Sequence, residues 1–172
     1  MNSKLSAIFA RRSVRKYADK PVSDATIRDL LEAAMSAPSA VAKDPWEFIV
    51  LKDKNIMKKV AEALPNGKML ESAPLGIIVC GDIQRAHSNE ISFLLQDCSA
   101  AIENILLAAS MLGLGACWLG VHPRQERIEH LKKLFNLPES VIPVSVISIG
   151  HPAEHKEART RYSGNFVHNG KW

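Results

Sequence analysis

The segment from Ile91 to Leu112 places the strongest constraint on how this chain can fold. Its apolar residues cover almost the whole circumference of a helix, and the few polar residues recur near helical spacing. These polar positions are Ser92, Gln96, Ser99, Glu103 and Ser110. A helix of this composition is buried on most sides. It is either the core helix of a monomer or a helix packed in a subunit interface. The interface is favoured, because a chain of 172 residues has few other elements to cover it.

The rest of the chain alternates strand and helix patterns, with loop chemistry between them. Strands are predicted from Trp46 to Leu51, Leu75 to Cys80, Ala116 to Val121 and Ile142 to Ile149. Helices are predicted from Ser3 to Arg11, Ser23 to Met35, Asp53 to Leu64 and Pro123 to Phe135. No repeat or internal boundary divides residues 1–172, so we expect one domain of mixed α and β structure.

The last stretch, residues 153–172, has no sustained hydrophobic period. It carries a second basic cluster at Arg159 and Arg161, followed by three aromatic residues, Tyr162, Phe166 and Trp172. Such a tail is either disordered or ordered by lying on another surface. The aromatic residues argue against pure solvation and favour the second alternative.

Composition and motifs exclude several classes of protein. The net charge of +4 and the pI near 9.0 favour anionic ligands without requiring nucleic acid. Cys80, Cys98 and Cys117 are odd in number, widely spaced and set in apolar contexts, which predicts buried thiols and no disulfide framework. His151 and His155 are separated by a proline and lack a third ligand nearby, so no metal site is predicted. With no leader and no uncharged run long enough to cross a bilayer, we expect a soluble cytoplasmic protein.

The stretch from Phe9 to Tyr17 concentrates positive charge directly after the first predicted helix. Arg11, Arg12 and Arg15 carry planar donor forks that bind phosphate or carboxylate with two parallel hydrogen bonds, and Ser13 adds a hydroxyl. On these residues alone, a phosphate-bearing ligand, a solvated basic loop and a nucleic-acid patch all remain open. The chain has neither a Gly-x-Gly-x-x-Gly turn nor a Walker loop, so a phosphate would have to be held another way.

Four motifs together make the chain resemble the FMN-dependent nitroreductases, in particular the short members of that family. The stretch from Arg11 to Tyr17 is similar to the N-terminal flavin-binding signature. The others are Ala37-Pro38-Ser39-Ala40 leading to Pro45-Trp46-Glu47-Phe48, then Gly113 to Gly120, and last Gly150-His151-Pro152 with Arg-Thr-Arg at 159–161. Their order and spacing cover nearly the whole chain, which makes the resemblance specific.

The resemblance implies an α+β fold in which a central, mainly antiparallel sheet is flanked by helices. It also implies an interlocked homodimer, in which each of two FMN sites is built from both chains. In that arrangement the helix from Ile91 to Leu112 is the central dimer helix. The C-terminal extension, about residues 153–172, would embrace the partner chain and can add a strand to its sheet.

The resemblance also implies which residues hold the phosphate end of FMN. Arg11, Arg12 and Ser13 are expected to engage the phosphate and the ribityl chain, and Arg159 and Arg161 to close on the phosphate from the C-terminal end. Five polar groups around a dianion make chemical sense, because charge-assisted hydrogen bonds are the strong ones.

Further residues are expected around the flavin ring. Arg15 would lie near the N1 and C2 carbonyl edge, where a fixed cation stabilises the negative charge that develops on reduction. Three residues would contact the ring from the partner chain: Pro38, Ser39 and Ala40. Three more would line its opposite face, with a backbone N–H near Gly120 reaching N5: Trp118, Leu119 and Gly120.

Two features depart from the family pattern. Ala42 and Asp44 stand where the family's Pro-Ser loop often carries Asn and then Gln, which puts that loop's hydrogen bonds to the pyrimidine edge in question. Lys68 is a weaker candidate for a cation near the ring. The helical insertion of larger members is absent, since only Ile83 to Glu90 intervenes, so the substrate channel is expected to be shaped differently.

The resemblance therefore predicts an FMN-dependent oxidoreductase with NADH or NADPH as electron donor. Hydride would pass to flavin N5, and the donor would then leave, in a ping-pong cycle, for an acceptor such as a nitroaromatic or a quinone. The flavin carries the chemistry, so no side chain is assigned as acid, base or nucleophile. Two alternatives remain: an FMN-binding protein for sensing or storage without turnover, and a basic nucleic-acid-binding module, which would be colourless and bind with steep salt dependence.

Overall fold

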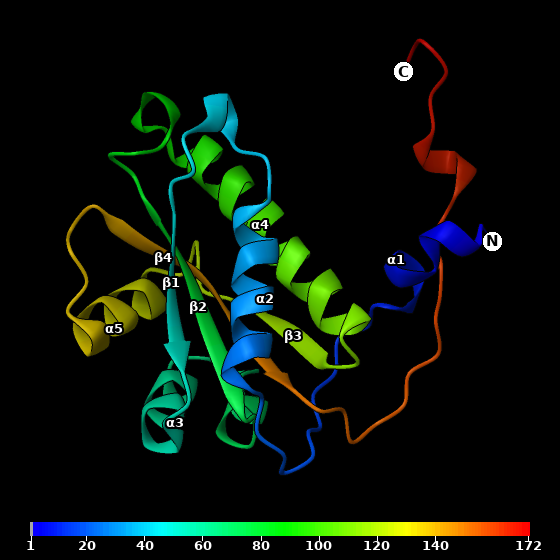
Figure 1. The fold of residues 1–172 in the computed structure, drawn as a ribbon. Helices are drawn as coiled ribbons and strands as arrows, with labels where there is room; N and C mark the ends of the chain where they lie inside the picture. The colour runs from blue at the N-terminus through cyan, green and yellow to red at the C-terminus, as the bar shows by residue number, and fades with distance from the viewer. Residues whose placement is uncertain (1) are drawn as a thin grey trace.

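The computed structural model describes residues 2–172 and is built around a four-stranded sheet (Figure 1). The strand order is β1-β2-β4-β3, and every neighbouring pair is antiparallel. The strands are β1 (Trp46–Leu51), β2 (Leu75–Asp82), β3 (Gly115–Gly120) and β4 (Val141–Gly150). They lie where the apolar runs predict strands, and the expected antiparallel sheet is confirmed.

Five α-helices accompany the sheet in the described part of the chain: α1 (Ser6–Ala10), α2 (Asp24–Met35), α3 (Lys54–Glu62), α4 (Ile91–Met111) and α5 (Gln125–Phe135). The predicted starts of α2 at Ser23 and of α3 at Asp53 are confirmed, because both residues are N-caps: Ser23 Oγ accepts the N–H of Thr26 and the Asp53 carboxylate accepts the N–H of Asn55. The predicted start of α5 at Pro123 is wrong. Residues 121–124 form a turn instead, closed by a hydrogen bond from a backbone N–H to a carbonyl three residues earlier.

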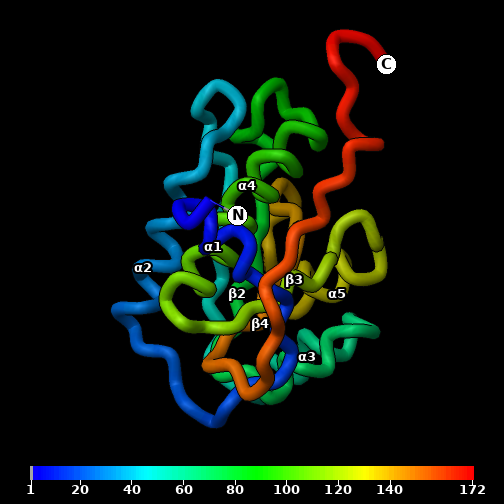
Figure 2. Tube along the Cα trace, turned by 90° about the vertical axis from the view of Figure 1, so that its right-hand side faces the viewer, coloured from blue at the N-terminus to red at the C-terminus, as the bar shows by residue number. Residues whose placement is uncertain are grey.

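The helices cover both faces of the sheet, which makes three layers (Figures 1 and 2). Because side chains alternate along a strand, Ile77 and Val79 of β2 pack with α2 and α4, whereas Ile78 and Cys80 pack with α3 and α5. This double burial explains why β2 reads as an unbroken apolar run.

Helix α4 packs against α2 and the sheet as the core helix of the chain. It is long and apolar enough to cross a membrane by length and composition alone, but Leu94, Ile102 and Ile105 are fully buried inside the protein. Its two ends keep Ile91 and Met111 exposed. Helix α4 therefore forms the hydrophobic core within one chain. The exposed residues at its ends leave part of its surface open to a partner.

All three cysteines are free and buried, as predicted. Burial raises the pKa of both Cys80 and Cys98 to about 12, because the thiolate would lose its solvation. These two thiols therefore behave as small apolar side chains.

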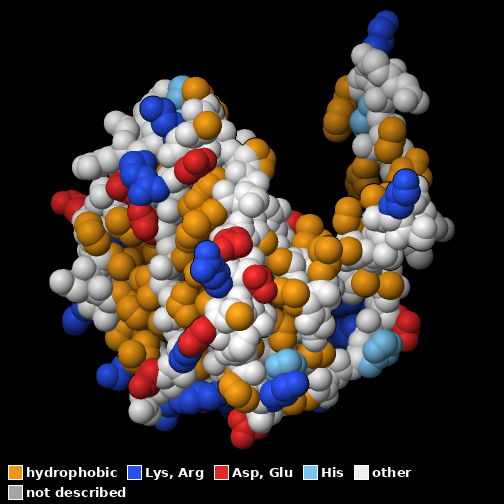
Figure 3. Space-filling view, viewed as in Figure 1, with side chains coloured by type: hydrophobic (Ala, Val, Ile, Leu, Met, Phe, Trp, Pro, Cys, Tyr) orange, Lys and Arg blue, Asp and Glu red, His pale blue; other side chains and the backbone are white. Residues whose placement is uncertain are grey.

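The C-terminal tail leaves the body of the molecule instead of folding onto it. After β4 the chain runs beside the N-terminal segment and then projects outward (Figure 2), and the space-filling view shows it standing clear with hydrophobic side chains along it (Figure 3). Tyr162, Phe166 and Trp172 are 80%, 83% and 101% exposed. The surface that the sequence predicts for these aromatics is not supplied by their own chain.

Candidate functional site

The basic stretch after α1 lies along the edge of the sheet, next to β3. The chain leaves the helix at Arg11, and the N–H of Val14 then donates to the carbonyl of Ala116 at 3.0 Å. Gly115 permits this approach, since a Cβ there would lie 2.6 Å from the side chain of Val14. Because Val14 turns into the core, its neighbours Ser13 and Arg15 turn to the opposite side. The sheet edge thereby sets the direction of the polar side chains.

The tail returns across this stretch and adds further cations. The N–H of Arg159 donates to the carbonyl of Phe9 at 3.2 Å, and Lys156 Nζ donates to the carbonyl of Ser13 at 2.6 Å. Arg12 donates in turn to the carbonyl of Glu157. These contacts fix the tail against residues 9–13 before it departs from the body.

Together the two segments enclose a small basic cavity of about 230 Å³, which we call the phosphate-side cavity. The residues that line it are Arg11, Arg12, Ser13, Arg15, Lys156, Arg159 and Arg161. All five of the residues that the sequence assigns to the phosphate end lie here. The nearest members of the two clusters, Ser13 and Arg159, are 146 residues apart in the chain. The structure thus brings the two basic clusters together.

Positive charge in this cavity is only partly neutralised. Arg11 Nε lies 3.2 Å from the carboxylate of Glu103 on α4, and Lys156 Nζ lies 3.1 Å from that of Glu154. Between residues 2 and 172, no carboxylate lies within ion-pair distance of Arg159 or Arg161. Arg161 and then Arg12 lower the pKa of Arg159 by like-charge repulsion. An anion in the cavity would relieve that repulsion.

A second, larger cavity of about 550 Å³ lies beside β3, and we call it the ring-side cavity. It is lined by Arg15, Leu64, Asn66, Gly67, Lys68, Met69, Cys117, Trp118, Leu119, Gly120 and Arg127. Trp118 is 39% exposed and offers a planar apolar surface. The space above Gly120 is open, with no atom within 4 Å of a built Cβ. Arg15 lines both cavities, so the two are neighbours that meet at one cation.

The predicted contacts Pro38, Ser39 and Ala40 lie elsewhere in the chain and line neither of these two cavities. They follow α2 at the end of the molecule where α4 begins, at the top of the view in Figure 1. The N–H of Ala40 donates to Asp97 of α4 at 2.8 Å. Within a single chain, the structure does not bring this loop to the arginines.

The loop after Ala40 is held in an unusual backbone conformation. Val41, Ala42 and Asp44 have φ values of 54°, 52° and 47°, in the left-handed region that non-glycine residues rarely adopt. Ser39 Oγ donates to the Asp44 carboxylate at 2.5 Å and accepts the Asp44 N–H at 3.0 Å. The carboxylate of Asp44 is therefore engaged inside the loop.

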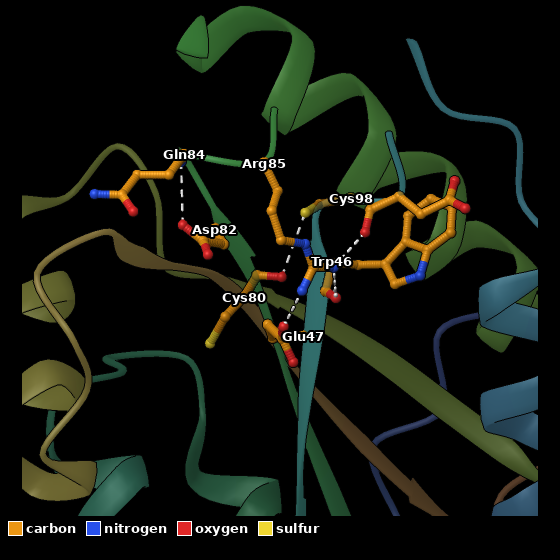
Figure 4. A network of polar contacts seen from close by, with 8 residues as sticks. Trp46, Glu47, Cys80, Asp82, Gln84, Arg85 and Cys98 are labelled. Carbon is orange, nitrogen blue, oxygen red and sulfur yellow. Dashed lines mark hydrogen bonds and ion pairs between the residues drawn. The ribbon is translucent and has the colours of Figure 1, made fainter. Parts of the chain in front are cut away.

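A side chain from another element clamps the end of this loop. Arg85, which follows β2, donates to the carbonyl of Asp44 and forms an ion pair with Glu47 on β1 (Figure 4). It also reaches the carbonyl of Trp46 at 3.4 Å. With Asp97 at one end and Arg85 at the other, two charged groups hold the strained segment in place.

Comparison with known proteins then identifies the family of the chain. Residues 8–66 and 63–151 match the model of the nitroreductase family. The chain belongs to the nitroreductase family. It is 45% identical, over the full length of both chains, to a protein of Archaeoglobus fulgidus whose name describes an NADH dehydrogenase or NAD(P)H nitroreductase.

Two solved structures support the same placement. A protein of Parabacteroides distasonis, named in the same way, is 40% identical and superposes with a TM-score of 0.93 over all of both chains. A nitroreductase of Desulfovibrio desulfuricans, solved in complex with FMN, is 31% identical with a TM-score of 0.85, over 100% of this chain and 99% of its own. The nitroreductase fold predicted from the four motifs is confirmed.

FMN fits the donors that this nitroreductase presents. The phosphate-side cavity offers several guanidinium groups and a hydroxyl to a dianion. Repulsion among its cations favours the binding of a dianion there. The ring-side cavity adjoins it and combines a partly exposed indole with a cation, as a planar ring with an electron-rich edge requires. In residues 2–172 there is no group of three or more potential metal ligands, so the described chain offers no rival metal centre.

Several lining residues of the two cavities escaped the sequence analysis. Lys156 lies in the same basic run as Arg159, and the density of positive charge near the C-terminus was the signal that could have found it. Arg127 and Asn66 reach the ring-side cavity from a helix and a turn with ordinary polar composition, so no sequence pattern marks them. Lys68, suggested only weakly, does line that cavity.

Proposed function

We propose that this protein is an FMN-dependent NAD(P)H oxidoreductase that reduces nitroaromatics, quinones or similar planar electrophiles. The observation that carries the proposal is the pair of adjacent cavities that meet at Arg15. One is lined by cations and a hydroxyl that would bind a phosphate dianion, and the other would hold a planar ring beside Trp118. The FMN complex of a full-length relative and the NAD(P)H named for others support the assignment of cofactor and donor.

The phosphate side would hold the cofactor by its charge. Arg11, Arg12, Ser13, Arg159 and Arg161 would donate hydrogen bonds to the phosphate and the ribityl chain. Because Arg159 and Arg161 come from the tail, the cofactor would also fasten the tail to the N-terminal segment. Binding and folding of these two segments would then stabilise each other.

The ring side would position the flavin and set its electrostatics. Arg15 would face the N1 and C2 carbonyl edge and favour added negative charge there. Trp118, Leu119 and Gly120 would line one face of the ring, with a backbone N–H near Gly120 directed at N5. When bound, FMN supplies hydride transfer between NAD(P)H and the acceptor. The chain contributes placement, charge and exclusion of water, and donor and acceptor would use the same open face in turn.

The complete site would require a homodimer formed by a single domain spanning residues 1–172. Pro38, Ser39 and Ala40 line neither cavity of their own chain, so they would reach the ring of the partner's cofactor. The exposed aromatics of the tail and the exposed Met111 at the end of α4 would be covered by the same partner. With free, buried cysteines and a core helix in place of a membrane helix, we place this dimer in the cytoplasm.

The visible absorbance spectrum before and after anaerobic addition of NADH or NADPH tests this function. The purified protein should be yellow, should release FMN on denaturation, and should bleach when the nicotinamide is added. Subsequent addition of a nitroaromatic or a quinone should restore the colour. A colourless protein that does not take up added FMN would overturn the proposal. A yellow protein that neither nicotinamide bleaches would instead indicate flavin binding without turnover.

A further inference from the structure

The ring-side cavity holds more positive charge than the proposed flavin contacts use. Three of its lining residues are cations, Arg15, Lys68 and Arg127, and none of the described residues that line it is an Asp or a Glu. Arg15 is assigned to the flavin edge, and Lys68 carries its charge on a flexible four-carbon stem. Arg127 remains as a fixed cation without a role in holding the cofactor.

The structure fixes Arg127 at the end of β3. It lies in the first turn of α5, and its Nη1 donates to the carbonyl of Gly120 at 2.7 Å. Its Nε is buried and has no hydrogen-bond partner within residues 2–172. The guanidinium has five N–H donors in a rigid fork, so one bond to Gly120 orients the group and leaves most donors free.

The position of that carbonyl gives the free donors a target. Gly120 is the residue proposed to lie at the N5 edge of the ring, and the acceptor must approach N5 from the open face to receive electrons. A cation tied to Gly120 therefore lies at the border of the acceptor position. Positive charge in a partly enclosed cavity with no acidic lining raises the local concentration of anions, and a guanidinium pairs with carboxylate or sulfonate in two parallel bonds.

We propose that Arg127 forms an anion-binding subsite for the electron acceptor, so that planar acceptors bearing a carboxylate or sulfonate are preferred over neutral ones of the same shape. The inference rests on the proposed function, because it uses the placement of the flavin against Gly120. It adds a substrate class, anionic planar electrophiles, and the residue that selects it.

The oxidative half-reaction tests the proposal without interference from the charged nicotinamide. The FMN-loaded dimer is reduced anaerobically with one equivalent of NADH and mixed with 4-nitrobenzoate or with 4-nitrobenzamide, which share shape and size. The second-order rate constants for return of the flavin colour give an anionic-to-neutral ratio. Comparing that ratio between variants cancels the different intrinsic reactivities of the two acceptors.

Three variants separate charge from structure. Arg127→Gln should lower the ratio about fivefold, the upper range for one partly exposed ion pair. Arg127→Lys keeps the charge and should keep most of the ratio. Arg124→Gln is the matched control, because Arg124 is one turn earlier, is exposed and does not line the cavity; its ratio should equal that of the wild type.

A binding measurement supplies a readout that does not depend on turnover. Benzoate and benzamide are titrated against the FMN-loaded protein, and the shift of the flavin absorbance reports each dissociation constant. The wild type should prefer benzoate, high salt should weaken that preference by screening, and Arg127→Gln should abolish it.

Three results would decide against the anion-binding subsite. An unchanged ratio in Arg127→Gln, or a preference of the wild type that salt does not affect, would overturn the proposal. An Arg127→Lys ratio as low as that of Arg127→Gln would show that Arg127 acts through the Gly120 carbonyl and not by its charge. Failure of the proposed function has a different signature, since the protein would then lack flavin or resist NADH. If Arg127→Gln does not fold, the salt dependence of the wild type and the Arg127→Lys ratio still decide.

Discussion

Arg15 lines both cavities. The backbone geometry at the edge of the sheet sets the direction of its side chain toward the proposed redox centre. Its direction follows from Val14, which turns into the core and so turns Arg15 outward. Its backbone is also fixed, because the N–H of Arg15 donates to Glu154 at 2.6 Å. That bond lowers the pKa of Glu154 more than any other interaction does, since it favours the ionised carboxylate.

Replacing Arg15 should change the electrochemistry of the protein. Arg15→Ala should lower the midpoint potential of the bound flavin, because a cation beside the ring stabilises the charge gained on reduction. The potential is measured by spectroelectrochemical titration of the FMN-loaded variant. Lys16→Ala removes the same charge from an exposed neighbour that does not line the ring-side cavity, and it should leave the potential unchanged. Equal potentials in wild type and Arg15→Ala would remove the assigned role.

Arg159 should contribute directly to cofactor affinity. Its pKa is lowered by Arg161 and Arg12, so the cluster repels itself until an anion enters. Arg159→Gln should raise the dissociation constant for FMN about tenfold, the effect of losing one charge-assisted hydrogen bond. The constant follows from quenching of flavin fluorescence during titration of the apoprotein.

Arg28→Gln is the control for net charge, because Arg28 pairs with Glu32 on the exposed face of α2, at 2.8 Å and away from both cavities. Its affinity for FMN should match that of the wild type. An Arg159→Gln protein that binds FMN as tightly as this control would show that the phosphate does not occupy the basic cavity.

At the scale of elements, local patterns define the strands well because the strands are short and buried. The apolar run of β2 and the alternation of β4 locate these strands to within two residues. The start of α5 was misplaced, since a proline is compatible with both a turn and a first helical turn. The strain at Val41 has no sequence signal at all, because a β-branched residue is the last type expected in the left-handed region.

Some residues of the candidate site can likewise be predicted from local sequence, and others cannot. The two basic clusters are visible as charge density, and the resemblance to the nitroreductases joins them into one site. Arg127 was missed because its importance depends on which carbonyl it meets at the end of a distant strand. Such tertiary contacts have no local periodicity from which to predict them.

The left-handed backbone of the loop between α2 and β1 should lower the free energy of unfolding by a measurable amount. Val41 is 71% exposed and has a φ of 54°, so Val41→Gly removes little packing and relieves the left-handed penalty. The relieved left-handed penalty of about 1–2 kcal/mol exceeds the cost of about 0.5–1 kcal/mol that glycine adds through the freedom of the unfolded chain. We therefore expect the free energy of unfolding to rise by about 0.5–1 kcal/mol, measured by urea denaturation at fixed protein concentration.

Lys43→Gly is the matched control, because Lys43 lies in the same loop with a φ of −83°. There the glycine brings only added freedom to the unfolded chain, so stability should fall by about 0.5–1 kcal/mol. A Val41→Gly protein that is destabilised as much as Lys43→Gly would show that the loop is not strained in solution.

At the scale of the whole molecule, the exposed tail supports the proposal that two chains together form the complete unit. Burying a large aromatic side chain is worth about 1.5–3 kcal/mol, yet Phe166 and Trp172 remain almost fully exposed in the chain alone. Meanwhile Arg159, a few residues earlier, is fastened to Phe9. The tail thus begins at the proposed cofactor site of its own chain and carries apolar groups away from it, so in the proposed dimer it would couple the cofactor to the assembly.

This coupling predicts the effect of removing the apolar anchors of the tail. The wild type should have a mass of about 38 kDa by light scattering, twice the 18.9 kDa of one chain. The double change Phe166→Ser and Trp172→Ser should shift the equilibrium toward the monomer at micromolar concentration and weaken FMN binding, although both residues lie outside the two cavities. The pair Lys4→Ser and Lys171→Ser is the control at exposed polar positions and should leave mass and affinity unchanged. A monomeric wild type would refute the shared site, whereas a dimeric double variant with normal affinity would show that α4 and the body of the chain hold the dimer without the tail.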